Sequence, residues 1–181
     1  MVGLIKRTFS YIGKDNVIFL TLYKALVRPH LEYGNVIWYP LLNLKRQSAS
    51  IERVQRRATK LLPECREKSY EDRLNYLRLP SLKARRERGD LIQAYKIFHQ
   101  IEDIDFNSLF QLSKSEITRG NKGKMFVKFA NTNLRKNSFA IRVVNKWNSL
   151  PTNIKLTDTL NSFKNLLDAN ILKKCRLDFD E

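Results

Sequence analysis

Between Ile51 and Leu62 the chain reads IERVQRRATKLL, a spacing that suits an α-helix and little else. At about 100° per residue, one stripe along such a helix is cationic and consists of Arg53, Arg56, Arg57 and Lys60. A second stripe, centred roughly 130° away, is apolar and consists of Ile51, Val54, Ala58, Leu61 and Leu62. The sequence therefore predicts a helix that buries one side in a core and presents a row of cations to a polyanion.

The whole chain is strongly basic. It contains 34 Lys and Arg residues against 18 Asp and Glu residues, for a formal net charge of +16. Such an imbalance causes self-repulsion unless an anionic partner neutralises it, and the usual partners are nucleic acid and anionic membrane surfaces. A basic protein with a well-solvated surface is the alternative interpretation. Because 43% of the residues are hydrophobic and 10% aromatic, the composition is that of a folded chain with a core.

The sequence also indicates a cellular setting. Cys65 and Cys175 lie far apart and do not resemble a disulfide framework, so we expect a reduced, intracellular location, nuclear or cytoplasmic. Lys6 and Arg7 interrupt the first apolar residues, which argues against a signal peptide. No segment approaches the ~18 apolar residues of a membrane span, and we expect no membrane partner. The basic N-terminus leaves a mitochondrial presequence as an alternative.

The pattern predicts a mainly α fold. Prolines divide the first part into helices over residues 2–11, 31–38, 44–62, 70–77 and 82–100, with one more that Asp15 caps and Pro29 bends or restarts. Ser69 is the expected N-cap of the helix over residues 70–77, with Asp72 three residues later. These segments form a predicted helical, thumb-like domain over residues 1–101.

The remaining residues are predicted as two further regions. Residues 102–136 have no helical period and are expected to form a basic loop, with a short strand or hairpin at residues 125–129. Residues 137–181 are expected to form a helical C-terminal extension, with a last helix over residues 160–174. Its first helix has an apolar seam of Phe139, Val143, Trp147 and Leu150. Three cations are expected to lie outside that seam: Arg135, Arg142 and Lys146.

Catalytic motifs fail on spacing. His30 and His99 are isolated from each other and from cysteine, so neither fits a metal-ligand pattern. Residues 118–125, TRGNKGKM, lack the first glycine of a phosphate-binding loop and have Met125 where a hydroxyl is required. No G-x-S-x-G nucleophile motif occurs.

The acidic pairs do not form a predicted metal site either. Asp103 with Asp105, and Asp178 with Asp180, lie in segments that the sequence predicts to be exposed and irregular. The residues YEDR at 70–73 are better explained as the first turn of a capped helix than as a polymerase motif. We therefore predict no catalytic residue, no metal ligand and no cofactor in this chain.

The function predicted from the residues is nucleic-acid binding through backbone contacts, by shape rather than by base sequence. The candidate binding residues are Lys6, Arg7, Lys45, Arg46, Arg53, Arg56, Arg57, Lys60, Lys83, Arg85, Arg86 and Arg88. Trp38, Tyr39 and Trp147 are possible stacking residues, but aromatic residues at this spacing usually belong to a core.

Several blocks of the sequence together resemble one protein family. The blocks are GLIKRTF at 3–9, LYKALVRPHLEY at 22–33, ERVQRRATK at 52–60, YEDRL at 70–74, RRERGDL at 85–91, TRG at 118–120, RVVNKWNSLP at 142–151 and NSFK at 161–164. In this order they are similar to the C-terminal region of reverse transcriptases of jockey-like non-LTR retrotransposons, over nearly the whole chain. Glu64 and Cys65 stand where members of that family often have a glycine-containing turn.

The resemblance implies that residues 1–101 act as a polymerase thumb that grips RNA or an RNA–DNA template–primer. It also implies that the fingers, the palm and its magnesium-binding aspartates precede Met1 in a longer polymerase, which would be a further partner. By this reading the chain is a non-catalytic fragment of an RNA-directed DNA polymerase. Two alternatives are an inert product of a truncated element and a host DNA-binding protein of helix-turn-helix type. The oligomeric state is left open.

Overall fold

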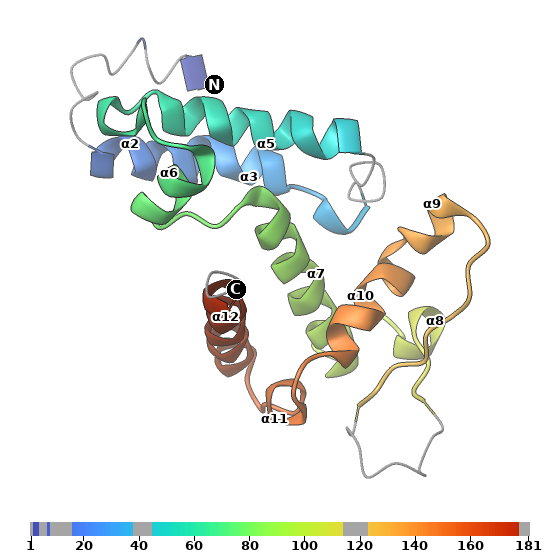
Figure 1. The fold of residues 1–181 in the computed structure, drawn as a ribbon. Helices are drawn as coiled ribbons and strands as arrows, with labels where there is room; N and C mark the ends of the chain where they lie inside the picture. The colour runs from blue at the N-terminus through green and yellow to red at the C-terminus, as the bar shows by residue number, and fades with distance from the viewer. Residues whose placement is uncertain (1, 4–6, 8–15, 38–44, 114–122, 178–181) are drawn as a thin grey trace. The chain divides into compact units, whose positions relative to one another are not determined.

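The computed structural model describes residues 2–3, 7, 16–37, 45–113 and 123–177, and among these the chain is mainly helical (Figure 1). The expected mainly α fold is confirmed. Contacts divide the chain into two compact units, Met1–Arg86 and Glu87–Glu181. The boundary lies inside helix α7 (Leu82–Phe98), and not at residue 101, where the hydrophobic period of the sequence changes.

The helical segment that begins at Asn16 contains a wider, π-helical turn. Helix α2 (Asn16–Leu22) leads into the π-helical turn η2 (Tyr23–Val27), and helix α3 (Arg28–Glu32) follows. Pro29 lies in the first turn of α3, a position that proline commonly occupies at the start of a helix. The expectation that Pro29 bends or restarts the helix is therefore confirmed.

The helix predicted over residues 31–38 is wrong. Helix α3 ends at Glu32, and the chain turns at Tyr33 and Gly34 before a short helical segment at residues 35–37. Gly34 has a φ of 61°, in the left-handed region that glycine adopts without steric cost. The apolar spacing across this segment concealed the turn, which the glycine itself signals.

Helix α5 (Lys45–Lys60) packs as its apolar stripe predicts. Ala58 and Leu62 are buried in a cluster with Tyr23 and Val27, and Val54 packs against that cluster. In Figure 1, α5 runs beside α2 and α3, in agreement with this shared core. The 3₁₀ turn η3 (Pro63–Cys65) ends the segment and buries Cys65 in the same cluster.

Helix α6 (Tyr70–Tyr76) begins at the predicted cap. The Ser69 hydroxyl accepts a hydrogen bond from the Asp72 backbone N–H at 3.2 Å. The residues YEDR thus form the first turn of a capped helix, as expected. Beyond the helix, Arg78 has a φ of 50° and the Leu79 N–H donates to the Leu74 carbonyl at 2.9 Å, which directs the chain toward α7.

Unit 2 contains most of α7 and five further helices among the described residues. These are α8 (Phe106–Leu109), α9 (Asn133–Lys136), α10 (Phe139–Asn148), α11 (Thr152–Lys155) and α12 (Leu160–Leu177). The predicted seam of α10 is confirmed, since Phe139, Val143, Trp147 and Leu150 are all buried. The Trp147 ring lies 5.3 Å from the Phe98 ring, between centroids, which identifies this tryptophan as a core residue.

The segment predicted as a loop has more helix and less strand than expected. Helices α8 and α9 both lie within residues 102–136, and Asp105 caps α8 by accepting from the Asn107 N–H at 3.1 Å. Among the described residues, the expected strand is reduced to one antiparallel bridge between Leu112 and Met125. Short helices of one turn have no repeating pattern to detect, which is why the sequence did not reveal them.

Candidate nucleic-acid interface

The cationic stripe of α5 lies on the exposed side of the helix. Arg53, Arg56, Arg57 and Lys60 are all exposed, and we call these four residues the basic row. Within the described part of the chain, no carboxylate forms an ion pair with any of them. The Arg56 guanidinium lies over the Tyr70 ring, 4.5 Å from its centroid. The structure therefore brings together four solvated cations on one helix face.

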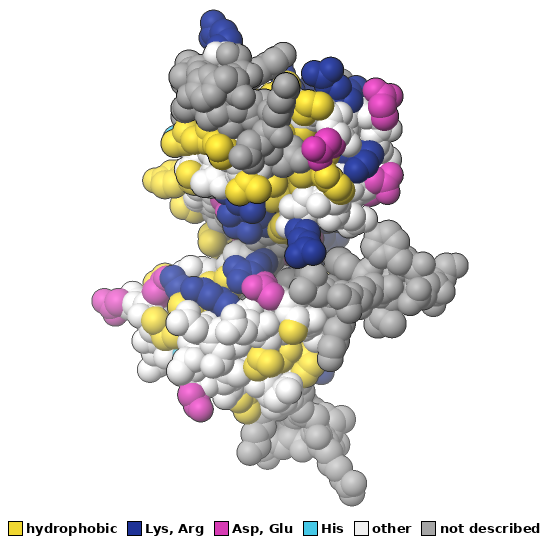
Figure 2. Space-filling view, turned by 90° about the vertical axis from the view of Figure 1, so that its left-hand side faces the viewer, with side chains coloured by type: hydrophobic (Ala, Val, Ile, Leu, Met, Phe, Trp, Pro, Cys, Tyr) yellow, Lys and Arg dark blue, Asp and Glu magenta, His cyan; other side chains and the backbone are white. Residues whose placement is uncertain are grey.

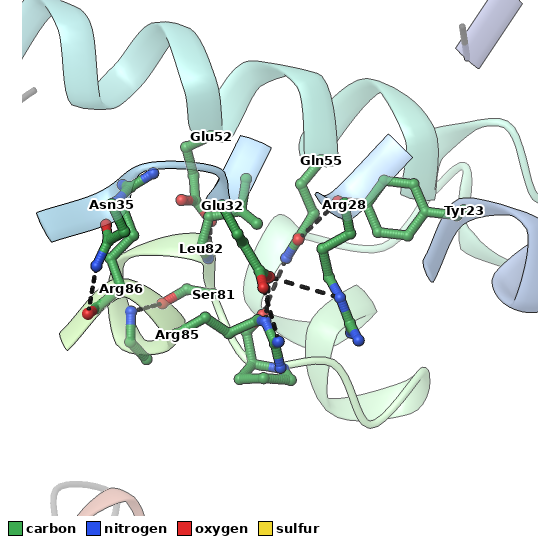
Figure 3. A network of polar contacts seen from close by, with 12 residues as sticks. Tyr23, Arg28, Glu32, Asn35, Glu52, Gln55, Ser81, Leu82, Arg85 and Arg86 are labelled. Carbon is green, nitrogen blue, oxygen red and sulfur yellow. Dashed lines mark hydrogen bonds and ion pairs between the residues drawn. The ribbon is translucent and has the colours of Figure 1, made fainter. Parts of the chain in front are cut away.

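The opposite side of α5 carries polar residues that fix its rotation (Figure 3). The Gln55 side chain is buried; its Oε1 accepts from the Tyr23 hydroxyl at 2.8 Å, and its Nε2 donates to the Pro80 carbonyl at 3.1 Å. The Thr59 hydroxyl, also buried, donates to the Gln55 carbonyl at 3.0 Å. The Thr59 bond lies within α5, whereas the two Gln55 bonds join α5 to other segments and hold it so that the basic row faces solvent.

Glu52 completes this set, which we call the polar latch: Glu52, Gln55 and Thr59. A Glu52 carboxylate oxygen accepts hydrogen bonds from the Tyr70 hydroxyl and, at 3.2 Å, from the backbone N–H of Leu82. Leu82 is the first residue of α7, so Glu52 satisfies a donor that the helix itself leaves unpaired. One side chain of α5 thus connects to both α6 and α7.

The tyrosines held by the polar latch stay protonated. Burial raises the pKa of Tyr23 well above its ordinary value. Burial and the hydrogen bond to Glu52 do the same for the pKa of Tyr70. Both phenols remain donors over the physiological pH range, and the latch keeps its hydrogen bonds. Sequence reasoning missed these residues, although Glu52, Gln55 and Thr59 recur at helical spacing beside the apolar stripe.

The basic residues predicted on α7 are distributed differently. Lys83 is exposed, but Arg86 is only 2% exposed, and this burial does not fit its predicted role as a phosphate ligand. Leu82, Arg86 and Asp90 follow one another at intervals of four residues, so all three lie on the same buried side of α7. The Arg86 carbonyl accepts a hydrogen bond from the Asn35 side chain at 2.9 Å (Figure 3).

Two other arginines of α7 are already matched by carboxylates. Arg85 forms a two-bond ion pair with Glu32, in which its Nη2 lies 2.8 Å from Oε2. Arg28 adds a third charge, with its Nε 3.5 Å from Glu32 Oε1. Arg88 binds both oxygens of Asp168, at 2.5 and 2.7 Å. A phosphate would have to displace these carboxylates, so the predicted roles of Arg85 and Arg88 are not supported by their geometry.

Of the remaining predicted binding and stacking residues, some lie outside the part of the chain that the structure describes. Arg7 is exposed, whereas Lys6, Trp38 and Tyr39 lie outside the described residues, as do the side chains of Lys45 and Arg46. On the face drawn in Figure 2, Lys and Arg side chains lie in separate small groups, with acidic and apolar side chains between them. Among the predicted binding residues that the structure describes, the four of the basic row lie together on one exposed helix face.

The histidines and the acidic pairs do not form a catalytic cluster among the described residues. His30 is exposed, and the His99 ring lies 4.2 Å from the Tyr95 ring with its Nε2 2.8 Å from the Lys155 carbonyl oxygen. Asp103 and Asp105 are exposed; Asp178, Asp180 and residues 118–122 lie outside the described part. Within the described ranges, no group of three or more His, Cys, Asp or Glu residues is placed to hold a metal ion. None of the described helices has the length and apolar character of a membrane span.

No protein-family model, curated protein or solved structure matches this chain.

Proposed function

We propose that this protein binds nucleic acid through the basic row of α5, by contacts with backbone phosphates. The row consists of four exposed cations on one helix face, and the polar latch holds that face toward solvent. From Arg53 to Lys60 the helix rises about 10 Å. This distance matches the axial rise of about three phosphates on one strand of a duplex. The solvated row is the observation that carries the proposal.

The charge environment supports a polyanion as the ligand. A phosphate that meets the row displaces water and counterions and does not have to break a protein ion pair with a described carboxylate. Four such contacts give a slope of log K against log salt of about −3.5 on a duplex. The row consists of charges at helical spacing without a set of base-reading side chains, which favours recognition of the backbone.

The partner that we favour is an RNA–DNA template–primer. The order of the sequence blocks supports this choice, because it resembles the C-terminal region of jockey-like reverse transcriptases. In this proposal the chain is the non-catalytic thumb and downstream region of an RNA-directed DNA polymerase. The basic row supplies grip on the duplex, and the magnesium ions belong to a palm outside this chain.

A charge-reversal variant with a matched control tests the proposal. Arg53, Arg57 and Lys60 are changed together to Glu, which keeps Arg56 over Tyr70; the control changes Lys24, Arg66 and Arg78, also exposed, to Glu. Each change to Glu lowers the charge by two, so both variants have a net charge of +10 in place of +16. Binding of a labelled RNA–DNA primer–template is measured by fluorescence anisotropy at several salt concentrations.

The row variant should bind at least about tenfold more weakly than the control, with a salt slope smaller in magnitude by about 3. Equal losses in both variants would mean that net charge alone attracts nucleic acid and would contradict a localised interface. Failure of the unaltered protein to bind at low salt would favour the inert product of a truncated element. Strong preference for one duplex sequence would favour the helix-turn-helix alternative.

A further inference from the structure

Unit 2 exposes aromatic rings that a folded protein usually buries. Phe129 is 85% exposed and Phe126 is 53% exposed, whereas Met125 between Lys124 and Phe126 is buried. Burying a phenylalanine side chain contributes roughly 2 kcal/mol, so leaving a ring in water forgoes that stabilisation. An exposed ring gains meaning as a binding feature where it also borders a pocket with polar groups.

Phe129 forms one wall of a pocket. The pocket has a volume of about 360 Å³ and is lined by Phe129, Asn131, Thr132 and Arg135. The Thr132 hydroxyl accepts a hydrogen bond from the Arg135 backbone N–H at 3.3 Å, which ties the two sides of the turn together. The pocket therefore combines an aromatic face, a side-chain amide and a guanidinium, and it is large enough for one small planar group.

The charge around the pocket selects an anionic ligand. Between Glu116 and Asp158 the sequence contains no acidic residue and nine basic ones. Arg142 and Lys146 are engaged by Asp90 and Glu87. The exposed cations nearest in sequence to the pocket are Lys124, Arg135 and Lys136, and none of them forms an ion pair with a carboxylate in the described ranges.

We propose that this pocket binds a nucleotide unit of single-stranded nucleic acid. The unpaired base stacks on the Phe129 ring, the Asn131 amide meets the edge of the base, and Arg135 binds a neighbouring phosphate. Aromatic stacking with interleaved cations is the usual way in which proteins bind single strands without reading sequence. A duplex does not offer this contact, because each base face is covered by the next base pair. The inference rests on residues of unit 2 alone and is independent of the basic row.

The test uses the full chain and a labelled twelve-nucleotide oligouridylate, with binding measured by fluorescence anisotropy. Phe129→Ala removes the stacking ring, Phe129→Trp replaces it with another aromatic ring, and Arg135→Gln removes the positive charge that would bind phosphate. Leu134→Ala is the control, because Leu134 is 69% exposed and adjacent in sequence but does not line the pocket. Far-ultraviolet circular dichroism confirms that each variant keeps its helicity.

We expect Phe129→Ala to weaken oligouridylate binding about tenfold, the effect of losing one stacked base. Phe129→Trp should keep the affinity of the unaltered protein, and the fluorescence of the new tryptophan should be quenched by the oligonucleotide. Arg135→Gln should reduce the magnitude of the salt slope by about 0.7. In each case Leu134→Ala should bind as the unaltered protein does.

Three results would overturn this inference. The first is an equal effect of Phe129→Ala and Leu134→Ala on oligouridylate. The second is that uridine monophosphate competes as tightly as the oligonucleotide, which would indicate a free-nucleotide pocket. The third is a Phe129-dependent affinity for phosphatidylserine vesicles that exceeds the affinity for oligouridylate. Failure here is distinguishable from failure of the basic row, whose variants are measured on a primer–template duplex.

Discussion

Asp90 and Arg142 form a buried ion pair that joins α7 to α10. The carboxylate accepts two hydrogen bonds from the guanidinium, at 2.8 and 2.9 Å, and the two side chains are 5% and 8% exposed. Arg142 Nη1 also donates to the Asn137 carbonyl at 2.8 Å. The sequence predicts Arg142 outside the apolar seam of α10, and what it does not reveal is that Asp90, far away in sequence, compensates the burial of its guanidinium.

Removing one member of this pair should destabilise the protein strongly. Asp90→Leu or Arg142→Met leaves an uncompensated buried charge, which costs about 3–5 kcal/mol in free energy of unfolding. The double variant removes both charges and should recover most of that loss. Urea unfolding of the two single variants and the double variant measures the coupling. Strictly additive losses would show that the two side chains act independently.

Lys155 should give the protein a distinctive dependence on alkaline pH. The side chain is fully buried, with its Nζ donating to the Asn148 carbonyl at 3.3 Å. Burial and the nearby Lys124 lower the pKa of Lys155 from 10.5 to about 8. Between these two pH values the unfolded chain binds more protons than the folded one, so the free energy of unfolding should rise with pH in this window.

The measurement is the difference in free energy of unfolding between the unaltered protein and Lys155→Met, from pH 7 to pH 10. The difference should shift in favour of the unaltered protein as the pH rises, by up to about 3 kcal/mol. Comparing the two proteins cancels the titration of Tyr23 and Tyr70, whose raised pKa values act in the opposite direction at higher pH. Parallel stability curves would contradict the burial of a titrating amine.

Gln100→Gly should stabilise the end of α7. Gln100 has a φ of 53°, a conformation that is unfavourable for residues with a Cβ atom. The turn is held by the Ile101 N–H, which donates to the Lys96 carbonyl at 2.8 Å. Glycine adopts this conformation without the steric cost and should raise the free energy of unfolding by about 0.5–1 kcal/mol. Thermal unfolding checks this, and Gln100→Ala, which keeps the Cβ, should give no gain.

Glu52→Ala should loosen the start of α7. The change removes the acceptor for both the Tyr70 hydroxyl and the Leu82 N–H, and we expect a loss of about 1–3 kcal/mol. Glu52→Gln keeps an acceptor oxygen and should lose less. Hydrogen exchange at Leu82 separates a local effect from a global one. Unchanged protection there in Glu52→Ala would contradict its role as a remote cap. The Glu52→Gln variant should also bring the pKa of Tyr70 closer to its ordinary value, because the charged partner is gone.

What the sequence predicts well is set by local periodicity. The buried stripe of α5, the Ser69 cap and the seam of α10 depend on residues within one or two helical turns of each other, and each was found where expected. The solvated basic row was predicted for the same reason.

What the sequence could not reveal depends on partners far along the chain. The sequence offered Arg86 as a phosphate ligand and gave no sign of a partner for Arg142, because burial of a charge is decided by tertiary packing. A partial signal existed for Arg86, since it stands between Leu82 and Asp90 on one stripe of α7. The pairing of Arg88 with Asp168 has no comparable signal, because 80 residues separate the two.

The polar latch has a consequence for engineering this protein. Because the Gln55 side chain sets the rotation of α5 from the interior, Arg53, Arg57 and Lys60 contribute little to holding the helix in place, whereas Arg56 packs over Tyr70. Arg53 and Arg57 are one turn apart, which is the spacing of a histidine pair that chelates a metal ion on a helix surface. New functional side chains can therefore be introduced at these exposed positions without redesigning the core beneath the helix.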